Sequence, residues 1–229
     1  MTNTELMKKN AGYLAASFVQ NGMTIGLGTG STAKYFIEKV AERIQKEHLK
    51  LTAVASSIKS LEQAQKAGIP IVDINTLTSI DLTVDGADEI DAKKRMIKGG
   101  GGALLREKIL ASMSKEMVVI VDESKVVPLL GHHKLPVEIA TFAHQVTLHH
   151  IQKLGFSAAF RCEKSSQEYY VTDNGNYLID IQFSSPLQQP EKEHALIKEI
   201  PGVVDTGFFF HLAGRVVIAF TDGQVIVKN

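Results

Sequence analysis

The feature that most constrains the fold lies in residues 80–108, where an expected strand runs into an acidic cluster and then a run of glycines. Residues 80–84 alternate apolar and polar side chains and are rich in β-branched residues, which predicts a strand. The sequence Asp-Gly-Ala-Asp-Glu follows directly at residues 85–89. In open α/β sheets ligands bind at the carboxyl ends of the strands, so we expect these carboxylates to lie at a binding site.

Four consecutive glycines, residues 99–102, follow Lys98 and precede a helical pattern that begins at Ala103. Glycine loses much conformational entropy on folding, so such a run is expected where the backbone needs positive φ or must approach another group closely. The first N–H groups of the following helix and the positive end of its dipole favour an anionic ligand or a developing oxyanion.

Glu107 is the candidate proton acceptor of this stretch. We place it in the second turn of the helix, about 60° around the axis from Leu104 and at the border of an apolar arc. The arc consists of Leu104, Leu105, Ile109 and Met113. A carboxyl group at the edge of a buried face loses hydration, which raises its pKa and suits it to accept a proton near neutral pH.

Composition excludes several classes of protein. The 25 basic residues balance the 25 acidic ones, which argues against a dedicated nucleic-acid binder. No apolar run has the length of a membrane span, and residues 1–5 lack the pattern of a secretory signal. The single cysteine, Cys162, rules out an intramolecular disulfide and a cysteine-built metal site. We therefore expect a cytoplasmic protein with no nucleic-acid or membrane partner.

Strands and helices alternate through the first part of the chain. The expected strands are residues 23–25, 51–55, 69–72, 80–84 and 117–121, and the helices are residues 4–19 and three segments that begin near residues 32, 58 and 103. Residues 117–121 are continuously apolar, as expected for a strand covered on both faces. This pattern predicts an α/β fold with a doubly wound, Rossmann-like sheet.

After Gly131 the pattern changes to strands and helices in a different order. Strands are expected at 137–142, 156–162, 169–172, 177–183 and 203–210, with helices at 145–154 and 191–200 and a hairpin turn at 173–176. This order approximates the βαββαβ unit of ferredoxin-like folds. Strands at 215–220 and 224–227 are expected to rejoin the first sheet. The predicted domains are therefore an α/β catalytic domain, 1–131 plus 207–229, and a small α+β domain, 132–206.

Residues 26–33, Gly-Leu-Gly-Thr-Gly-Ser-Thr-Ala, invite a dinucleotide-binding interpretation, but they fail its requirements. Ser31 occupies the place of the third glycine, and the next strand ends in two serines rather than a carboxylate. A P-loop would need a lysine before Ser31. Two interpretations stay open: Thr29, Gly30, Ser31 and Thr32 wrap a phosphate, or a Ser/Thr side chain caps the next helix.

A metal site has little support, although five of the eight histidines lie between residues 132 and 150. They do not form a His-x3-His pair with a nearby acidic third ligand. Asp85 and Asp88 alone would also suit a calcium-like loop or a solvated acidic turn, but their proximity in sequence to Lys98 and Glu107 favours a catalytic site. We expect neither a metal nor a cofactor.

Four motifs, in order along the chain, resemble those of ribose-5-phosphate isomerase, type A. They are residues 26–33, 85–89, 98–107 and 122–125, and segments 135–138, 172–176 and 201–204 match as well. The resemblance covers essentially the whole chain; residues 205–208 depart from the usual pattern and residues 161–170 are polar and variable in character, but both stretches lie outside the motifs and concern only subunit contacts. It implies an aldose–ketose isomerase of the non-oxidative pentose phosphate pathway. Such an enzyme interconverts D-ribose 5-phosphate and D-ribulose 5-phosphate without a metal, as a homodimer or a tetramer.

The resemblance also implies roles for individual residues. The catalytic set is Glu107, Asp85, Asp88 and Lys98, with Glu107 as the proton acceptor. The sugar phosphate would contact Thr29, Gly30, Ser31, Thr32, Asp85, Gly86, Ala87, Asp88, Lys98, Gly99, Gly100, Gly101 and Lys125. One carboxylate can carry a proton between C2 and C1 through an enediolate that Lys98 and N–H groups stabilise. Either Asp85 or Asp88 would open the sugar ring, and either Lys125 or Lys8 would assist phosphate binding.

Two other classes of function remain open. One is a different sugar-phosphate enzyme on the same architecture, such as an amino-sugar phosphate isomerase or a phosphogluconolactonase. The other is a non-catalytic sugar-phosphate sensor of the kind found in transcription regulators. A sensor would be expected to carry a helix-turn-helix with a basic surface, whereas a single expected helix, residues 4–19, precedes the first strand.

Overall fold

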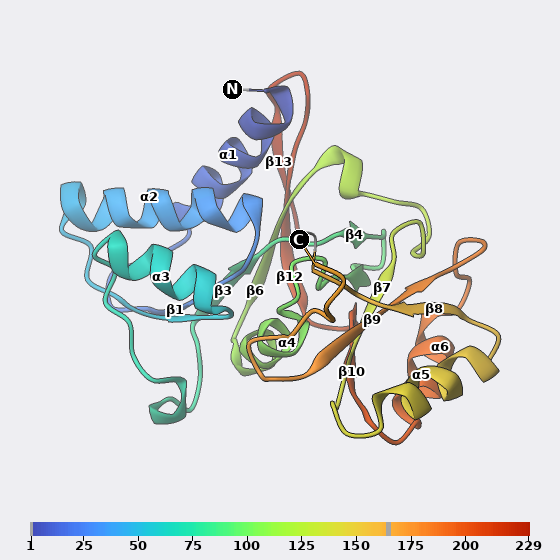
Figure 1. Ribbon diagram of the computed structural model, residues 1–229. Helices are drawn as coiled ribbons and strands as arrows, with labels where there is room; N and C mark the ends of the chain where they lie inside the picture. Colours follow the sequence, from blue (N-terminus) through green and yellow to red (C-terminus); the bar gives the residue numbers. More distant parts are fainter. Residues whose placement is uncertain (1, 164–165) are drawn as a thin grey trace. The chain divides into compact units, whose positions relative to one another are not determined.

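The structure, a computed structural model, describes residues 2–163 and 166–229 (Figure 1). The chain groups into two compact units, each made of several segments. Unit 1 comprises residues 1–87, 106–126 and 211–229, and unit 2 comprises residues 88–105 and 127–210. Unit 2 therefore includes three segments that the sequence analysis places in the first domain: residues 88–105, 127–131 and 207–210. The division into two domains stays a prediction.

Unit 1 is built on a six-stranded sheet in the order β13-β12-β6-β3-β1-β2. Its strands are β1 (Thr24–Leu27), β2 (Thr52–Ala55), β3 (Leu82–Asp85), β6 (Met117–Asp122), β12 (Ala213–Ala219) and β13 (Val225–Lys228). All neighbouring pairs are parallel except β12–β13, which is antiparallel at the edge of the sheet. The parallel α/β sheet is therefore confirmed, and the C-terminal strands rejoin it as predicted.

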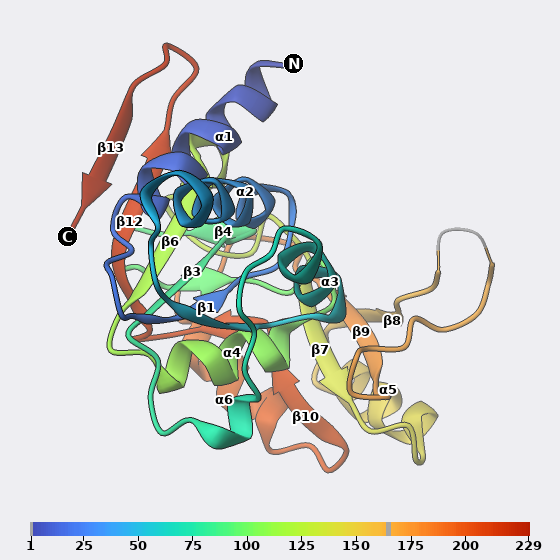
Figure 2. The same cartoon turned by 90° about the vertical axis from the view of Figure 1, so that its left-hand side faces the viewer.

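Helices cover both faces of this sheet. They are α1 (Asn3–Ala16), α2 (Ser31–Glu47), α3 (Ile58–Lys66) and α4 (Leu104–Met113). The main core joins apolar side chains of α1 and α2 and Ala64 of α3 to one face, and Leu110 of α4 packs with Val54 and Ile80 on the other. Figure 2 shows α2 and α4 on opposite sides of the strands. Every residue of β6 is buried, as its continuous apolar sequence predicts.

Residues 69–72 do not form the expected strand. Within this stretch only Ile71 forms a β-bridge, and its partner is Ala53. The Ala53 N–H donates to Pro70 O at 2.8 Å, and the Val72 N–H donates to Ala53 O at 3.0 Å. Pro70 has no N–H, and Asp73 immediately caps the short 3₁₀ helix η1 (Ile74–Thr76), so the pairing cannot continue. Unit 1 also contains the short 3₁₀ helix η2 (Glu123–Lys125).

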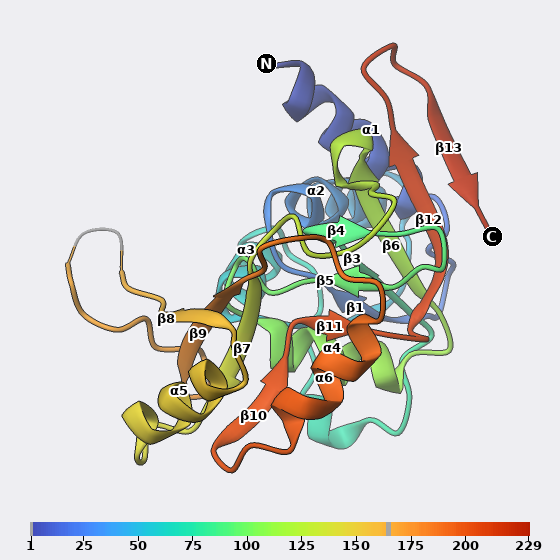
Figure 3. The ribbon, with the colours of Figure 1, turned by 90° about the vertical axis from the view of Figure 1, so that its right-hand side faces the viewer.

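Unit 2 contains a four-stranded antiparallel sheet in the order β10-β7-β9-β8. Its elements are β7 (Leu135–Ile139), α5 (His144–Lys153), β8 (Ser157–Phe160), β9 (Tyr177–Gln182), α6 (Pro190–Lys198) and β10 (Val203–Thr206). Ile151 of α5 and Ile197 of α6 join the core of this sheet, and Figure 3 shows both helices beside its strands. The chain order and the strand order together are those of the predicted ferredoxin-like unit.

A second, three-stranded sheet in unit 2 has the order β11-β5-β4. Its strands are β4 (Glu89–Ile90), β5 (Met96–Ile97) and β11 (Phe208–Phe209). The strand expected over 203–210 is therefore divided at Gly207 between two sheets. A Cβ atom at Gly207 would lie 2.3 Å from Lys98 O, so the chain can cross there only without a side chain. Phe208 and Phe209 are buried core residues.

Two other expected strands of unit 2 are shorter than predicted. Residues 169–172 form only isolated bridges, Tyr169 with Cys162 and Val171 with Tyr177. The strand expected over 137–142 ends at Ile139, because the chain turns outward and Phe142 is 89% exposed. No helix of the described residues is both long and apolar enough to cross a membrane.

Candidate functional site

The carboxyl ends of β1, β2 and β3 meet at one edge of the unit 1 sheet. Leu27 of β1 lies opposite Ala55 of β2 and Val84 of β3 in the parallel register. The pairing continues past the strand ends, with Gly28 N–H donating to Val84 O at 2.9 Å and Ser56 N–H to Leu27 O at 3.0 Å. Residues 29–32, which the sequence predicts to wrap a phosphate, therefore begin beside Asp85.

Asp85 and the loop after β1 are directly joined. Asp85 Oδ1 accepts hydrogen bonds from Thr29 N–H at 3.0 Å and from Gly86 N–H at 2.8 Å. A Cβ atom at Gly28 would lie 2.2 Å from the same oxygen, so Gly28 is required for this close approach. Asp85 is 1% exposed, and its carboxylate is held in one orientation by these contacts.

The Thr29 side chain is tied to a group of serines that sequence reasoning did not select. Its hydroxyl lies 2.7 Å from Ser56 Oγ and 2.8 Å from Ser57 Oγ. Ser60 Oγ donates to Gly28 O at 2.7 Å, which links the loop to the first turn of α3. In the sequence, the serines after β2 show only that no carboxylate ends this strand. In the structure, they support the loop after β1.

The start of α2 excludes one of the two interpretations of this loop. Gly30 is the N-cap residue, with φ of +108°, and no side chain forms a capping hydrogen bond there. Ser31 and Thr32 are the first helical residues, and Lys34 N–H donates to Gly30 O at 3.1 Å. The prediction of a Ser/Thr N-cap is therefore wrong, because the cap position falls on a glycine. The binding of a phosphate remains a prediction.

Glu107 occupies the buried face of α4. It is the fourth residue of the helix and therefore lies in its first turn, not in the second as predicted. Glu107 is 4% exposed, and the buried positions of α4 are Leu104, Glu107, Leu110 and Ala111. Ile109, assigned to the buried arc from the sequence, is 43% exposed. The helix packs through positions spaced by three and four residues from Leu104, so Glu107 lies in the middle of the buried face rather than at its border.

Lys125 lies at the carboxyl end of β6, two strands from β1 in the sheet. Asp122 Oδ1 caps η2 by accepting from Ser124 N–H at 3.1 Å. Lys125 is partly exposed and lies at the same sheet edge as Asp85, because β3 and β6 are parallel neighbours. Lys8, the other candidate lysine, lies in α1.

In unit 2, Asp88 and the glycine run are in direct contact. Asp88 Oδ2 accepts from Gly100 N–H at 2.8 Å, and Asp88 N–H donates to Ile97 O at 2.9 Å. Gly99 and Gly102 have φ of +97° and +87°, as expected for a run of glycines that needs positive φ. The predicted acidic cluster and the predicted glycine loop are thus brought together at these residues.

Lys98 is buried at the entrance to the glycine run. It is 2% exposed, and its ammonium group lies 5.4 Å from the centroid of the Phe209 ring. Its backbone N–H donates to Gly207 O at 2.8 Å, which fixes the residue between β5 and β11. Asp88 and Lys98 belong to unit 2, and Asp85 and Glu107 belong to unit 1.

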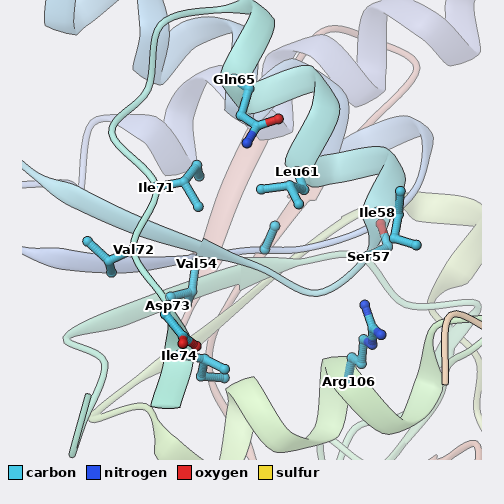
Figure 4. Close-up of a pocket in the computed structure, with 11 residues that line it drawn as sticks. Val54, Ser57, Ile58, Leu61, Gln65, Ile71, Val72, Asp73, Ile74 and Arg106 are labelled. Carbon is cyan, nitrogen blue, oxygen red and sulfur yellow. The ribbon is translucent and has the colours of Figure 1, made fainter. Parts of the chain in front are cut away.

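Each unit also contains a pocket. In unit 1 a pocket of about 390 Å³ lies beside the end of β2, and Figure 4 shows Arg106 of α4 extending toward Ser57 and Ile58 of α3. In unit 2 a pocket of about 480 Å³ is lined by Asp88, Gly100, His132, His133, Lys134, Arg161, Cys162, Asp180 and Gln182. Among the described residues, no group of three or more His, Cys, Asp or Glu side chains could hold a metal ion.

Comparison with known proteins assigns the family. The family model described as ribose 5-phosphate isomerase A (phosphoriboisomerase A) matches residues 52–223. The ribose-5-phosphate isomerase A of Protochlamydia amoebophila (strain UWE25) is 51% identical over 217 residues, which cover 95% of this chain and 93% of that protein. The chain belongs to the ribose 5-phosphate isomerase A family. The resemblance stated from the motifs is confirmed.

Solved structures of the ribose 5-phosphate isomerase A family have the same fold. The ribose 5-phosphate isomerase from Plasmodium falciparum matches with a TM-score of 0.93 and 37% identity, covering 98% of each chain. A D-ribose-5-phosphate isomerase in complex with phospho-erythronic acid matches with a TM-score of 0.94 and 32% identity, covering 100% of each chain. The fold described above is therefore that of the family over essentially the whole chain.

Proposed function

We propose that this chain interconverts D-ribose 5-phosphate and D-ribulose 5-phosphate, an aldose–ketose isomerisation of pentose phosphate metabolism. Membership of the ribose 5-phosphate isomerase A family supports the activity. The observation that carries the mechanism is the burial of Glu107 in the first turn of the helix that follows the glycine run. A carboxylate there is shielded from water and fixed in position, as a proton-transferring group requires.

Glu107 is the group that moves the proton. It removes the proton from C2 of the open-chain aldose, so that the C2–H electron pair forms the enediolate with negative charge on O1. A proton passes from O2 to O1, the same carboxyl group returns its proton to C1, and the carbonyl group forms at C2. Lys98 and the N–H groups of the glycine run stabilise the charge on the enediolate oxygen, because preorganised donors in a dry site act most strongly on developing charge.

Asp88 is our candidate for opening the sugar ring. Asp85 Oδ1 is occupied by two backbone N–H groups, and the residue is almost fully buried. Asp88 is partly exposed and lines the unit 2 pocket, so a sugar hydroxyl can reach it. Asp85 then acts by holding the loop that begins at Thr29. We propose that Ser31 and Thr32 of this loop bind the phosphate group, with the help of Lys125 or Lys8.

The assembly and the location complete the proposal. We propose that the chain acts in the cytoplasm as a homodimer, with a tetramer as the alternative, and needs no metal or cofactor. A homodimer has twice the chain mass of 25.0 kDa in light scattering. A monomeric mass for the active protein would contradict the proposed assembly.

The experiment that tests the activity is a turnover assay on ribose 5-phosphate, with exchange of the C2 proton into solvent followed alongside. Glu107→Gln is expected to retain sugar-phosphate binding while kcat falls by about 10²-fold or more, because the amide cannot accept the proton. The matched control is Glu62→Gln, at an exposed position of α3 that pairs with Lys66 at 3.9 Å. Its kcat should equal that of the wild type.

The outcomes of this assay separate the candidate functions. Near-normal turnover of Glu107→Gln would remove Glu107 from its role. A wild-type protein that binds the sugar phosphate without turning it over would favour the sensor. Turnover of a different sugar phosphate alone would favour another enzyme on the same architecture.

A further inference from the structure

A side chain that the mechanism above does not use holds the glycine run in place. Arg161, which follows β8, donates from Nη1 to Gly99 O at 3.2 Å and to Gly100 O at 3.1 Å. Its Nε donates to Asp180 Oδ2 at 3.0 Å, and its Nη2 pairs with Asp180 Oδ1. Asp180 lies in the middle of β9, a central strand of the unit 2 sheet. The guanidinium group therefore connects two loop carbonyls to a rigid strand.

The direction of these carbonyls determines the direction of the neighbouring N–H groups. In a trans peptide, the C=O of one residue and the N–H of the next point to opposite sides of the chain. When Arg161 holds Gly99 O and Gly100 O, the N–H groups of Gly100 and Gly101 must point away from the guanidinium group. The Gly100 N–H accordingly donates to Asp88 Oδ2 at 2.8 Å.

Glycines make such a restraint necessary. A glycine peptide plane can rotate through conformations that other residues avoid. The turn in which Gly102 N–H donates to Gly99 O at 2.9 Å fixes one N–H group of the run, but the peptides between these residues need a restraint from outside. Arg161 is suited to this task because its planar group offers several donors in a fixed geometry. Its side chain is only 16% exposed, and that of Asp180 is 15% exposed, so the pair is largely shielded from competing water.

Tyr170 restrains the next peptide of the run. Its hydroxyl donates to Gly101 O at 3.4 Å, and a Cβ atom at Gly102 would lie 2.4 Å from the tyrosine oxygen. Burial raises the pKa of Tyr170, so the hydroxyl keeps its proton and remains a donor. The carbonyls of three consecutive glycines thus accept hydrogen bonds from two side chains, those of Arg161 and Tyr170.

We propose that Arg161, held by Asp180, is a positioning residue that aims the Gly101 N–H at the reacting sugar and the Gly100 N–H at Asp88. The inference rests on the isomerase function proposed above and adds a residue to it. Arg161 does not touch the substrate in this scheme; it sets the direction of the Gly101 N–H, which stabilises the enediolate, and of the Gly100 N–H, which holds Asp88. Loss of this restraint should therefore affect the transition state more than the binding of the substrate.

The test compares Arg161→Met with Arg161→Lys and Asp180→Asn. In Arg161→Met we expect kcat for ribose 5-phosphate to fall by about 10- to 100-fold with KM within about threefold, because small misplacements of catalytic donors cost rates of this order. Inhibition by phospho-erythronic acid, whose carboxylate resembles the charged enediolate, should weaken by a similar factor. Arg161→Lys, which keeps a donor and the charge, should recover part of kcat, and Asp180→Asn should show a milder form of the Arg161→Met defect.

The matched control is Arg215→Met. Arg215 forms the same kind of bidentate pair, with Glu116 at 2.7 and 2.8 Å, but it belongs to unit 1, whereas the glycine run belongs to unit 2. Its loss should lower thermal stability without changing kcat. Nitrogen-15 glycine labelling provides a readout besides activity, since the Gly100 and Gly101 amide resonances should shift in Arg161→Met and stay unchanged in Arg215→Met.

The outcomes distinguish this inference from the proposed function. If the wild type does not isomerise ribose 5-phosphate, the proposed function fails and the inference fails with it. If the wild type is active and a folded Arg161→Met keeps the wild-type kcat, only the inference fails. An equal fall in the kcat of Arg161→Met and of the Arg215→Met control would also overturn the inference, because both losses would then reflect general destabilisation.

Discussion

The two carboxylates of the acidic cluster, Asp85 and Asp88, differ in their surroundings although they lie three residues apart. Asp85 receives N–H groups from its own loop and from the loop after β1, whereas Asp88 receives one from Gly100. The first carboxylate is buried at the end of a parallel strand, and the second lines a pocket. The sequence leaves open which of the two opens the sugar ring, and from these surroundings we propose a supporting role for Asp85 and a chemical role for Asp88.

Replacement of Asp88 by Asn tests this difference through the two directions of the reaction. Ribulose 5-phosphate cannot form the furanose ring that ribose 5-phosphate forms, because its carbonyl is at C2 and its O5 carries the phosphate. Asp88→Asn should therefore slow net conversion by about 10-fold or more while solvent deuterium still enters C1 of ribulose 5-phosphate at a near-normal rate. Proton magnetic resonance follows both processes in one sample. An equal loss of exchange and conversion would place Asp88 in the proton transfer instead.

At the scale of single elements, Asp81 joins the amino ends of three parallel strands. It precedes β3, and its Oδ2 accepts from Thr24 N–H of β1 at 2.8 Å. Its Oδ1 accepts from Lys115 Nζ, just before β6, at 2.7 Å. The hydrogen bond from Lys115 and then that from Thr24 lower the pKa of Asp81 below its ordinary value of 3.8.

This lowered pKa makes a prediction about acid stability. A carboxyl group with a lower pKa in the folded state than in the unfolded state stabilises the fold above pH 3.8, and the contribution is lost as the pH falls through the folded-state pKa. Asp81→Asn should therefore lower the free energy of unfolding near neutral pH, and its difference from the wild type should shrink below about pH 4. Urea unfolding at a series of pH values measures this. A difference that stayed constant with pH would mean that the charge of Asp81 plays no part.

Element boundaries were least predictable where one element meets another. The run 203–210 has the composition of one strand, yet it is divided at Gly207 because the backbone there passes against Lys98 O and Pro136. Residues 69–72 resemble a strand but stop at a single bridge. In α4 the periodicity identified the helix, but not the face on which Glu107 lies, because the apolar residues of α4 are spread around the helix.

At the scale of the whole molecule, the proposed chemistry needs no metal. Charge on the enediolate is stabilised by Lys98 and backbone N–H groups in this scheme, which replace the Lewis acid that some isomerisations require. Exhaustive chelation followed by assay in metal-free buffer is therefore expected to leave kcat within about twofold of the untreated enzyme. Loss of activity that added divalent ion restores would contradict the scheme.

The sequence alone determined the class of fold, the family and the positions of the motifs. Hydrophobic periodicity, glycine runs and acidic turns are local patterns, so they identify β1, α2, β3 and α4 and the residues between them without knowledge of their neighbours. The resemblance assigned Thr29 and Asp85 to substrate contact, and the two residues are hydrogen-bonded in the structure, because parallel strands end at a common edge.

Only the tertiary structure decided which groups hold these motifs in place. The serines behind Thr29, the division at Gly207 and the contacts of Arg161 with the glycine run join residues far apart in the chain. Residues 161–170, of which 164 and 165 lie outside the described part of the chain, have no local pattern that indicates such a role. Contacts of this kind depend on packing and register, which a one-dimensional pattern does not contain.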